Sequence, residues 1–151
     1  MRLTKEEKLF LKKRIEKKIE EIETYLEDLY SFVPENIEEY KGDVVKRMAC
    51  ERCCEKIAEA LVDLAIFLIR FKEIGYNDED EKAFGVLLKN NIIDEKLCGK
   101  LRNLKGMRDY IAHRYGEIND EIVFNSVKND LEKDVEDFLA MSKKIANECI
   151  I

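Results

Sequence analysis

The sequence has few residues that interrupt helices. Its 151 residues include one proline, six glycines and one histidine, while tryptophan and glutamine are absent. Lysine, glutamate, leucine and isoleucine are abundant, and these residues favour helices. There is no alternation of apolar and polar residues of the kind that predicts strands. We therefore expect an all-α chain that folds as a single helical domain over residues 1–151.

The sequence also lacks the features of an exported or membrane protein. The segment Met1–Arg14 is charged and has no apolar core of the kind found in a signal peptide. The longest uninterrupted apolar run, Leu64–Ile69, is far too short to span a bilayer. We expect a cytoplasmic protein with no membrane partner.

The supply of metal-binding residues is small. A di-metal site in a helical bundle needs a Glu-x-x-His motif on each of two helices, and a single histidine excludes it. Of the five cysteines, Cys50, Cys53 and Cys54 fall close together in a helical stretch without a second short-spaced pair elsewhere. Buried cysteines acting as small apolar residues are the better interpretation. We expect neither a metal nor a cofactor.

Apolar residues recur at helical spacing in five segments, each opened by a capping residue or a turn. The predicted helices run from the Thr4–Glu7 capping box to about Leu29, from Asp43 to about Lys72, over 81–89, from Asp94 towards His113, and from Asp120 to about Ile145. Ser31–Gly42, which contains Pro34, breaks the chain and holds one helical turn around 37–40. The short connections predict an up-and-down antiparallel bundle of four long helices plus a short one.

The fourth of these segments contains an arginine where an apolar residue is expected. Its apolar positions recur at three- and four-residue spacing, and Arg108 falls into the same series. The series is Leu97, Leu101, Leu104, Arg108, Ile111 and Tyr115. A cation at such a position loses hydration unless a partner compensates it, so its presence requires an explanation.

His113, the only histidine, follows Arg108 by five residues. On an ideal helix the two side chains are separated by about 140°, so they cannot both point at one small target from one continuous helix. Either the helix ends near His113 and lets this side chain turn, or a second copy of the chain completes the site. Gly116 favours an ending at this point, and both interpretations remain open.

The net charge of −6 argues against a broad surface for nucleic acid. The charge is nevertheless unevenly distributed, because the segment 96–116 contains six cations and one acid, Asp109. The cations are Lys96, Lys100, Arg102, Lys105, Arg108 and Arg114. This surplus fits a solvated helix face and a locally positive groove for phosphate equally well.

The run from Leu101 to Asp109, followed by His113 and Tyr115, resembles the signature of HEPN-domain proteins. It is similar in particular to the HepT-like ribonucleases: arginine, four residues, histidine, any residue, tyrosine. The resemblance implies metal-independent RNA cleavage at a homodimer interface. Arg108 would bind the phosphate, His113 would move protons, and Asp109 would orient one of them. An alternative assignment to Arg102 fits the histidine spacing less well.

The HepT-like branch implies a toxin of a HepT/MntA-type (type VII-like) toxin–antitoxin pair. Its partner would be an MNT-type nucleotidyltransferase antitoxin that attaches AMP to Tyr115, whose added negative charge would repel RNA. The alternative hypothesis is a non-catalytic helical binding module associated with a nucleotidyltransferase. The acidic net charge favours this alternative slightly, because a protein partner needs no basic field.

Overall fold

The computed structural model describes residues 2–75, 82–114 and 117–148, which form helices joined by short connections. The elements are α1 (Lys5–Phe32), α2 (Ile37–Gly42), α3 (Val44–Phe71), α4 (Ala83–Lys89), α5 (Glu95–His113), α6 (Asp120–Ser126), the π-helical segment η1 (Val127–Leu131) and α7 (Glu132–Ala146). No strand occurs among the described residues. The predicted all-α fold is confirmed.

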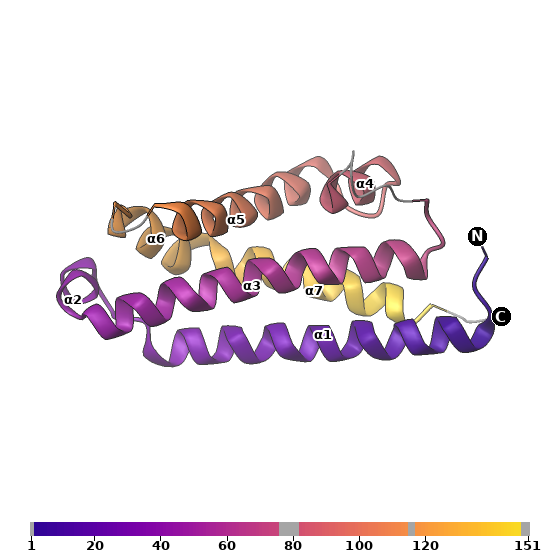
Figure 1. Ribbon diagram of the computed structural model, residues 1–151, viewed down its shortest axis with the longest axis horizontal. Helices are drawn as coiled ribbons and strands as arrows, with labels where there is room; N and C mark the ends of the chain where they lie inside the picture. The colour runs from indigo at the N-terminus through magenta and orange to yellow at the C-terminus, as the bar shows by residue number, and fades with distance from the viewer. Residues whose placement is uncertain (1, 76–81, 115–116, 149–151) are drawn as a thin grey trace.

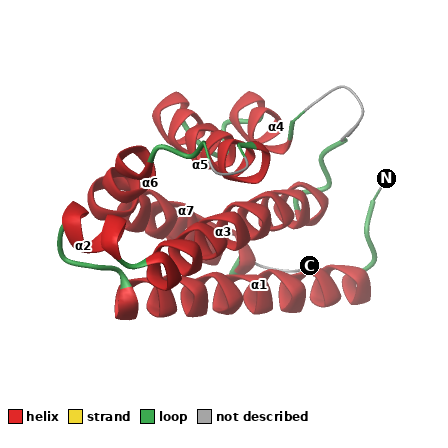
Figure 2. Ribbon diagram, turned by 60° about the vertical axis from the view of Figure 1, so that its left-hand side comes forward, coloured by secondary structure: helices red, strands yellow, loops and turns green. Residues whose placement is uncertain are grey.

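The long helices pack as an antiparallel bundle. α1 and α3 lie side by side, α5 runs along the other side of α3, and α6, η1 and α7 cover the back (Figures 1 and 2). α3 contacts each of the other long helices, and its buried residues form one face over its whole length. These are Cys50, Cys54, Ile57, Ala58, Ala60, Leu61, Leu64, Ala65, Leu68, Ile69 and Phe71. Within the described ranges, no helix is both long and apolar enough to traverse a bilayer.

The starts of the long helices follow the predicted caps. The Thr4 hydroxyl accepts a hydrogen bond from the Glu7 N–H at 3.1 Å, and the Glu7 carboxylate accepts one from the Thr4 N–H at 3.0 Å. Asp43 and Asp94 accept from backbone N–H groups three residues further on, at 3.0 and 2.7 Å. Each such cap contributes about 1 kcal/mol to stability. Together they fix where α1, α3 and α5 begin.

The last helix differs from its prediction. Asn119, not Asp120, is the capping residue, and its side chain accepts from the Glu121 N–H at 3.0 Å. The helix is also interrupted by η1, whose first carbonyl, that of Val127, accepts a hydrogen bond from the Tyr30 hydroxyl of α1. A side chain that bonds to a helix carbonyl favours a wider π-type turn at that point. The apolar residues at helical spacing in this region are all buried: Phe124, Val127, Leu131, Val135, Phe138 and Ile145.

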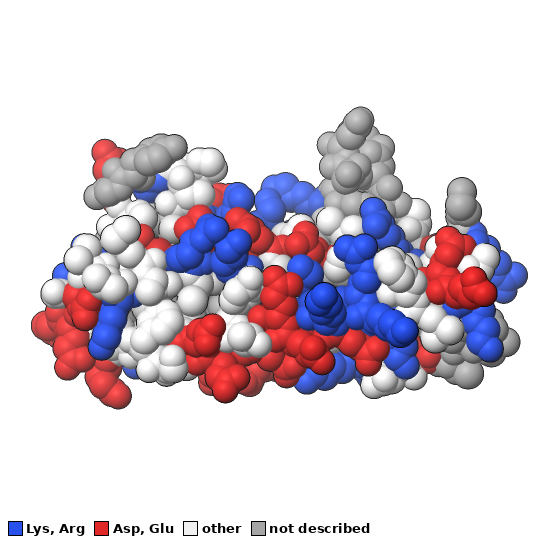
Figure 3. Space-filling model, turned by 60° about the horizontal axis from the view of Figure 1, so that its bottom comes forward, with Lys and Arg blue, Asp and Glu red and all other residues white. Residues whose placement is uncertain are grey.

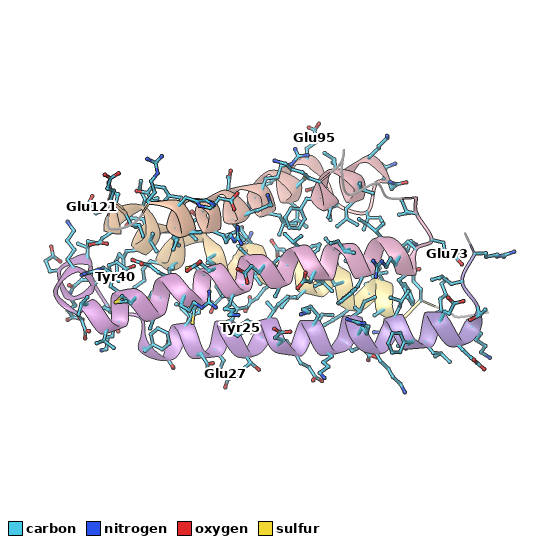
Figure 4. The ribbon with its side chains drawn as sticks, in the orientation of Figure 1. Tyr25, Glu27, Tyr40, Glu73, Glu95 and Glu121 are labelled. Atoms are coloured by element: carbon cyan, nitrogen blue, oxygen red, sulfur yellow. The ribbon has the colours of Figure 1, made fainter. Side chains whose placement is uncertain are left out.

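The core is one continuous apolar cluster to which all the long helices contribute. Tyr40 of α2 closes it at one end, where its ring lies 5.2 Å from that of Phe124 (Figure 4). Its hydroxyl is buried and has no hydrogen-bond partner among the described residues, and burial raises its pKa. Cys50, Cys54 and Cys98 are buried and free, whereas Cys53 is half-buried. Cys149 lies outside the described residues.

Candidate active site

α5 positions the predicted site residues on its last two turns. The buried face of the helix runs through Leu101, Leu104, Met107 and Ile111. Arg108 is therefore one position away from this face, and its side chain remains 36% exposed. The predicted placement of Arg108 within the apolar series is wrong, because Met107 fills that place and Arg108 lies at the boundary between core and solvent.

Two carboxylates hold the Arg108 guanidinium. Nη1 donates to Asp109 Oδ1 at 2.9 Å, and Nη2 donates across to Glu59 Oε1 of α3 at 3.5 Å. Nε is buried and finds no acceptor within the part of the chain that is described. The hydrogen bond from Arg108 holds the pKa of Asp109 below its usual range, and the same bond raises the pKa of Arg108. The guanidinium is thus fixed on the surface between α3 and α5.

Asp109 was expected to orient either His113 or Arg108. The structure places it on Arg108, and Lys105 lies 3.9 Å from its other oxygen. His113 acts on the pKa of Asp109 only through its charge. Asp109 is therefore positioned to orient Arg108.

His113 is the last residue of α5 and is exposed, with Arg114 as the C-cap. Its side chain makes no hydrogen bond to any described residue. Because His113 still belongs to the helix, its direction differs from that of Arg108 by about 140°. The helix does end at this point, as predicted, but the ending does not bring His113 to Arg108 within one chain.

Two residues that follow the last turn of α5 contact Tyr110 of this helix. The Tyr110 hydroxyl accepts from the Asn119 N–H at 2.7 Å, and the Arg114 guanidinium lies over the Tyr110 ring at 5.4 Å. These contacts hold Arg114 and Asn119 against Tyr110. Tyr115 itself, the predicted AMP acceptor, lies outside the described residues.

A cavity of about 240 Å³ lies beside Arg108, between α3 and α5. Its lining residues are Ala58, Glu59, Val62, Asp63, Lys105 and Arg108. Glu59 and Asp63 bring negative charge to a site predicted to bind phosphate. Sequence reasoning did not single them out, because they are two of many acids on the polar side of α3 and their proximity to α5 depends on helix packing.

In the folded chain, carboxylates from other elements offset part of the positive charge that the sequence of α5 carries. Lys100 pairs with the buried Asp134 of α7 at 3.0 Å, and that hydrogen bond contributes to a raised pKa of Lys100. Arg108 has Asp109 and Glu59, and Arg114 covers Tyr110. Other elements therefore supply carboxylates that the local sequence does not contain. Within the described part of the chain, no group of three or more His, Cys, Asp or Glu side chains is arranged to bind a metal ion.

An antiparallel helical bundle whose α5 carries Arg108 and His113 at the spacing Arg-x4-His is the arrangement expected of the HEPN class of proteins. Residues 22–142 match the family described as Ribonuclease HepT-like, and the chain belongs to this family. The resemblance found in the sequence is confirmed.

Relatives within this family are named as RNA-cleaving enzymes. The mRNA nuclease HepT of Shewanella oneidensis is 33% identical over 93 residues, which cover 62% of this chain and 66% of that protein. The tRNA nuclease HepT of Aphanizomenon flos-aquae is 24% identical over 119 residues, or 79% of this chain and 81% of that one. The expected enzyme class, an RNA endonuclease, agrees with these relatives.

The fold also matches a solved toxin structure. The tri-AMPylated HEPN toxin of Shewanella oneidensis, in complex with an MNT antitoxin, superposes with a TM-score of 0.74 at 27% identity. The match covers 86% of this chain and 96% of the toxin chain. The predicted bundle is therefore that of a HEPN toxin.

Proposed function

We propose that this chain is a metal-independent endoribonuclease toxin whose active site forms where two copies meet. The observation that carries the proposal is the placement of Arg108 and His113 on one continuous helix, in a chain of a ribonuclease family. One copy presents these side chains in different directions. Two copies packed around the ends of their α5 helices would bring Arg108 of one and His113 of the other to the same phosphate.

The chemistry needs no external nucleophile. His113 removes the proton from a ribose 2′-hydroxyl, whose oxygen then forms a bond to the adjacent phosphorus. The bond from phosphorus to the 5′-oxygen breaks, and that oxygen receives the proton that His113 took from the 2′-hydroxyl. The products are a 2′,3′-cyclic phosphate and a 5′-hydroxyl.

Arg108 stabilises the charge on the phosphate during this reaction. Its planar group of donors suits two phosphate oxygens. Asp109 holds one side of the guanidinium at 2.9 Å, whereas the contact to Glu59 is long at 3.5 Å and can be exchanged for phosphate.

Exposed apolar residues offer a surface for the second copy. Val45 is 73% exposed, Met48 is 62% exposed, and Ile122 of α6 is 53% exposed. The start of α3, α6 and the end of α5 lie at one end of the molecule (Figure 1). Met48→Glu should dissociate the dimer in analytical ultracentrifugation. Leu9→Glu, a matched change near the other end of the bundle, should leave it intact.

A nucleotidyltransferase antitoxin of the MNT type would neutralise this nuclease by transferring AMP to Tyr115. Support comes from the AMPylated relative in complex with such an antitoxin and from the position of Tyr115 two residues after His113. The added phosphate charge would repel RNA from Arg108 and His113. Tyr115→Phe should keep the nuclease active in the presence of the partner and ATP.

The experiment that tests the activity is cleavage of mixed RNA by the chain made without its partner, in excess EDTA. Wild type and Arg70→Ala, an exposed arginine on α3, should cleave. Arg108→Ala and His113→Ala should not. Absence of cleavage by folded, unmodified wild type would overturn the proposal in favour of a binding module for a nucleotidyltransferase.

A further inference from the structure

A second hollow lies between α3 and the first half of α1. Its volume is about 320 Å³, and its lining residues are Phe10, Arg14, Lys17, Lys18, Glu21 and Phe67. The Arg14 guanidinium lies 4.9 Å from the centroid of the Phe67 ring and 5.7 Å from that of Phe10. Phe10 is 60% exposed. Cationic groups and aromatic rings thus alternate across an open groove.

The cations of this groove differ in their partners. Lys18 is paired with Glu21 at 2.9 Å and with Asp63 at 3.6 Å. Arg14 and Lys17 are exposed and have no carboxylate partner among the described residues. In a chain with a net charge of −6, two such cations beside an exposed phenylalanine form a local binding surface for an anion with an aromatic part.

This groove lies near the cavity beside Arg108. Asp63 lines that cavity and pairs with Lys18 of the groove at 3.6 Å, so one ion pair lies between the two hollows. Along α3, Glu59 and Phe67 are eight residues apart, or about 12 Å at 1.5 Å per residue. A chain bound at Arg108 therefore needs only a short extension to reach Arg14.

The distribution of charge along α1 agrees with this placement. Residues 5–18 contain seven cations and three acids, whereas residues 20–39 contain eight acids and no cation. In Figure 3, Lys and Arg gather mainly towards the right, where α1 begins, and Asp and Glu dominate the lower left, where it ends. An RNA strand would be attracted to the first half of α1 and repelled by the second.

We infer that the α1–α3 groove is an accessory RNA-binding site that holds a single-stranded stretch next to the bond being cleaved. Arg14 and Lys17 bind phosphates, and one base stacks on Phe10. The inference rests on the proposed ribonuclease function and adds that the substrate is single-stranded next to the cleaved bond. The groove requires a single strand because the base must leave its helix to reach an aromatic ring. Residues 5–18 precede the segment 22–142 that matches the family.

The test compares two charge reversals of equal size. Arg14→Glu with Lys17→Glu is measured against Lys133→Glu with Lys144→Glu, two exposed lysines of α7. The probe is a fluorescein-labelled single-stranded RNA, with anisotropy for Kd and cleavage for kcat and KM. The α1 pair should raise Kd and KM at least tenfold with kcat within twofold of wild type. The slope of log K against log salt should fall by about 0.7 per lost cation.

A second variant tests stacking without a change of charge. Phe10→Ala should raise the Kd for single-stranded RNA at least about fivefold. This factor corresponds to the low end of the stacking energy of one base on an aromatic ring. Phe10→Tyr should retain binding, and binding of a duplex of the same length should not change. Because Phe10 is exposed, circular dichroism should show unchanged folding.

The outcomes separate this inference from the proposed function. Wild-type cleavage with unchanged Kd in both α1 variants overturns the accessory site and leaves the nuclease standing. Equal losses in the α7 control also overturn it, because they reflect net charge alone. Specific loss of RNA binding in the α1 variants, with no cleavage by wild type, supports the groove while the nuclease proposal fails.

Discussion

Arg14 of α1 and Arg108 of α5 both lie beside α3, yet their surroundings are opposite. Arg108 is held by Asp109 and Glu59, and its pKa is raised through these contacts. Arg14 lies against the rings of Phe67 and Phe10 with no carboxylate partner among the described residues. The first arrangement fixes the direction of a guanidinium, and the second leaves its donors available. This difference supports the proposal that Arg108 is oriented toward a reacting phosphate and that Arg14 binds adaptably.

Replacement of each arginine by lysine should affect the kinetics of RNA cleavage most differently at the two positions. Arg108→Lys removes the planar group that contacts both Asp109 and a phosphate, so kcat should fall about 100-fold or more. Arg14→Lys keeps the charge and loses only the ring contact, so KM should rise by no more than about fivefold. Steady-state cleavage of one RNA by both variants measures this. Similar effects at the two positions would contradict the distinction.

Glu59→Gln removes one of the two carboxylate partners of Arg108 and so leaves more of its donors available, as they are at Arg14. Two unit charges 4 Å apart in water interact with about 1 kcal/mol, so removal of one carboxylate beside the phosphate should lower KM about fivefold. Glu55→Gln, an acid on the same helix with no contact to Arg108, serves as the control. A large fall in kcat for Glu59→Gln would instead assign Glu59 a role in positioning Arg108.

Tyr30→Phe tests a contact that is remote from both arginines. The change removes the hydroxyl that donates to the Val127 carbonyl and should cost about 1 kcal/mol of stability. For a chain of this size the expected fall in Tm is about 2–4 °C. RNA cleavage at 25 °C should be unchanged. A changed kcat would link η1 to the active site.

Loss of the Arg108–Asp109 ion pair should have the smallest effect on stability among these changes. Surface ion pairs contribute roughly 0.2–1 kcal/mol, so Asp109→Asn should lower Tm by about 1–3 °C at pH 7. The folded-state pKa of Asp109 is lowered, mainly by the hydrogen bond from Arg108. The contribution is therefore complete above the unfolded pKa near 4 and is lost as pH falls through the folded value. Melting curves between pH 3 and 7 should show the difference down to about pH 4.

Much of the fold could be predicted because it depends on local signals. Thr4, Asp43 and Asp94 cap their helices through residues three positions away, and the apolar faces follow from helical periodicity. η1 could not be predicted, because its hydrogen-bond partner Tyr30 lies 97 residues before Val127.

The sequence singles out the candidate site residues, but it does not predict their surroundings. Arg108, Asp109 and His113 stand out in the sequence, and Asp109 does bond to Arg108. Glu59 contacts Arg108 across 49 residues of sequence, a proximity that only the packing of α3 against α5 creates. The assignment of Arg108 to the apolar face failed because Met107, its neighbour by one position, fits the same spacing and is buried.

The most direct test of the central claim is to mix two inactive variants. If Arg108 of one copy acts with His113 of the other, Arg108→Ala and His113→Ala chains should restore activity when subunits exchange. Random exchange makes half of the dimers mixed, each with one complete site, so roughly a quarter of wild-type activity should return. If each chain uses its own Arg108 and His113, the mixture should remain inactive, and the shared site would be refuted.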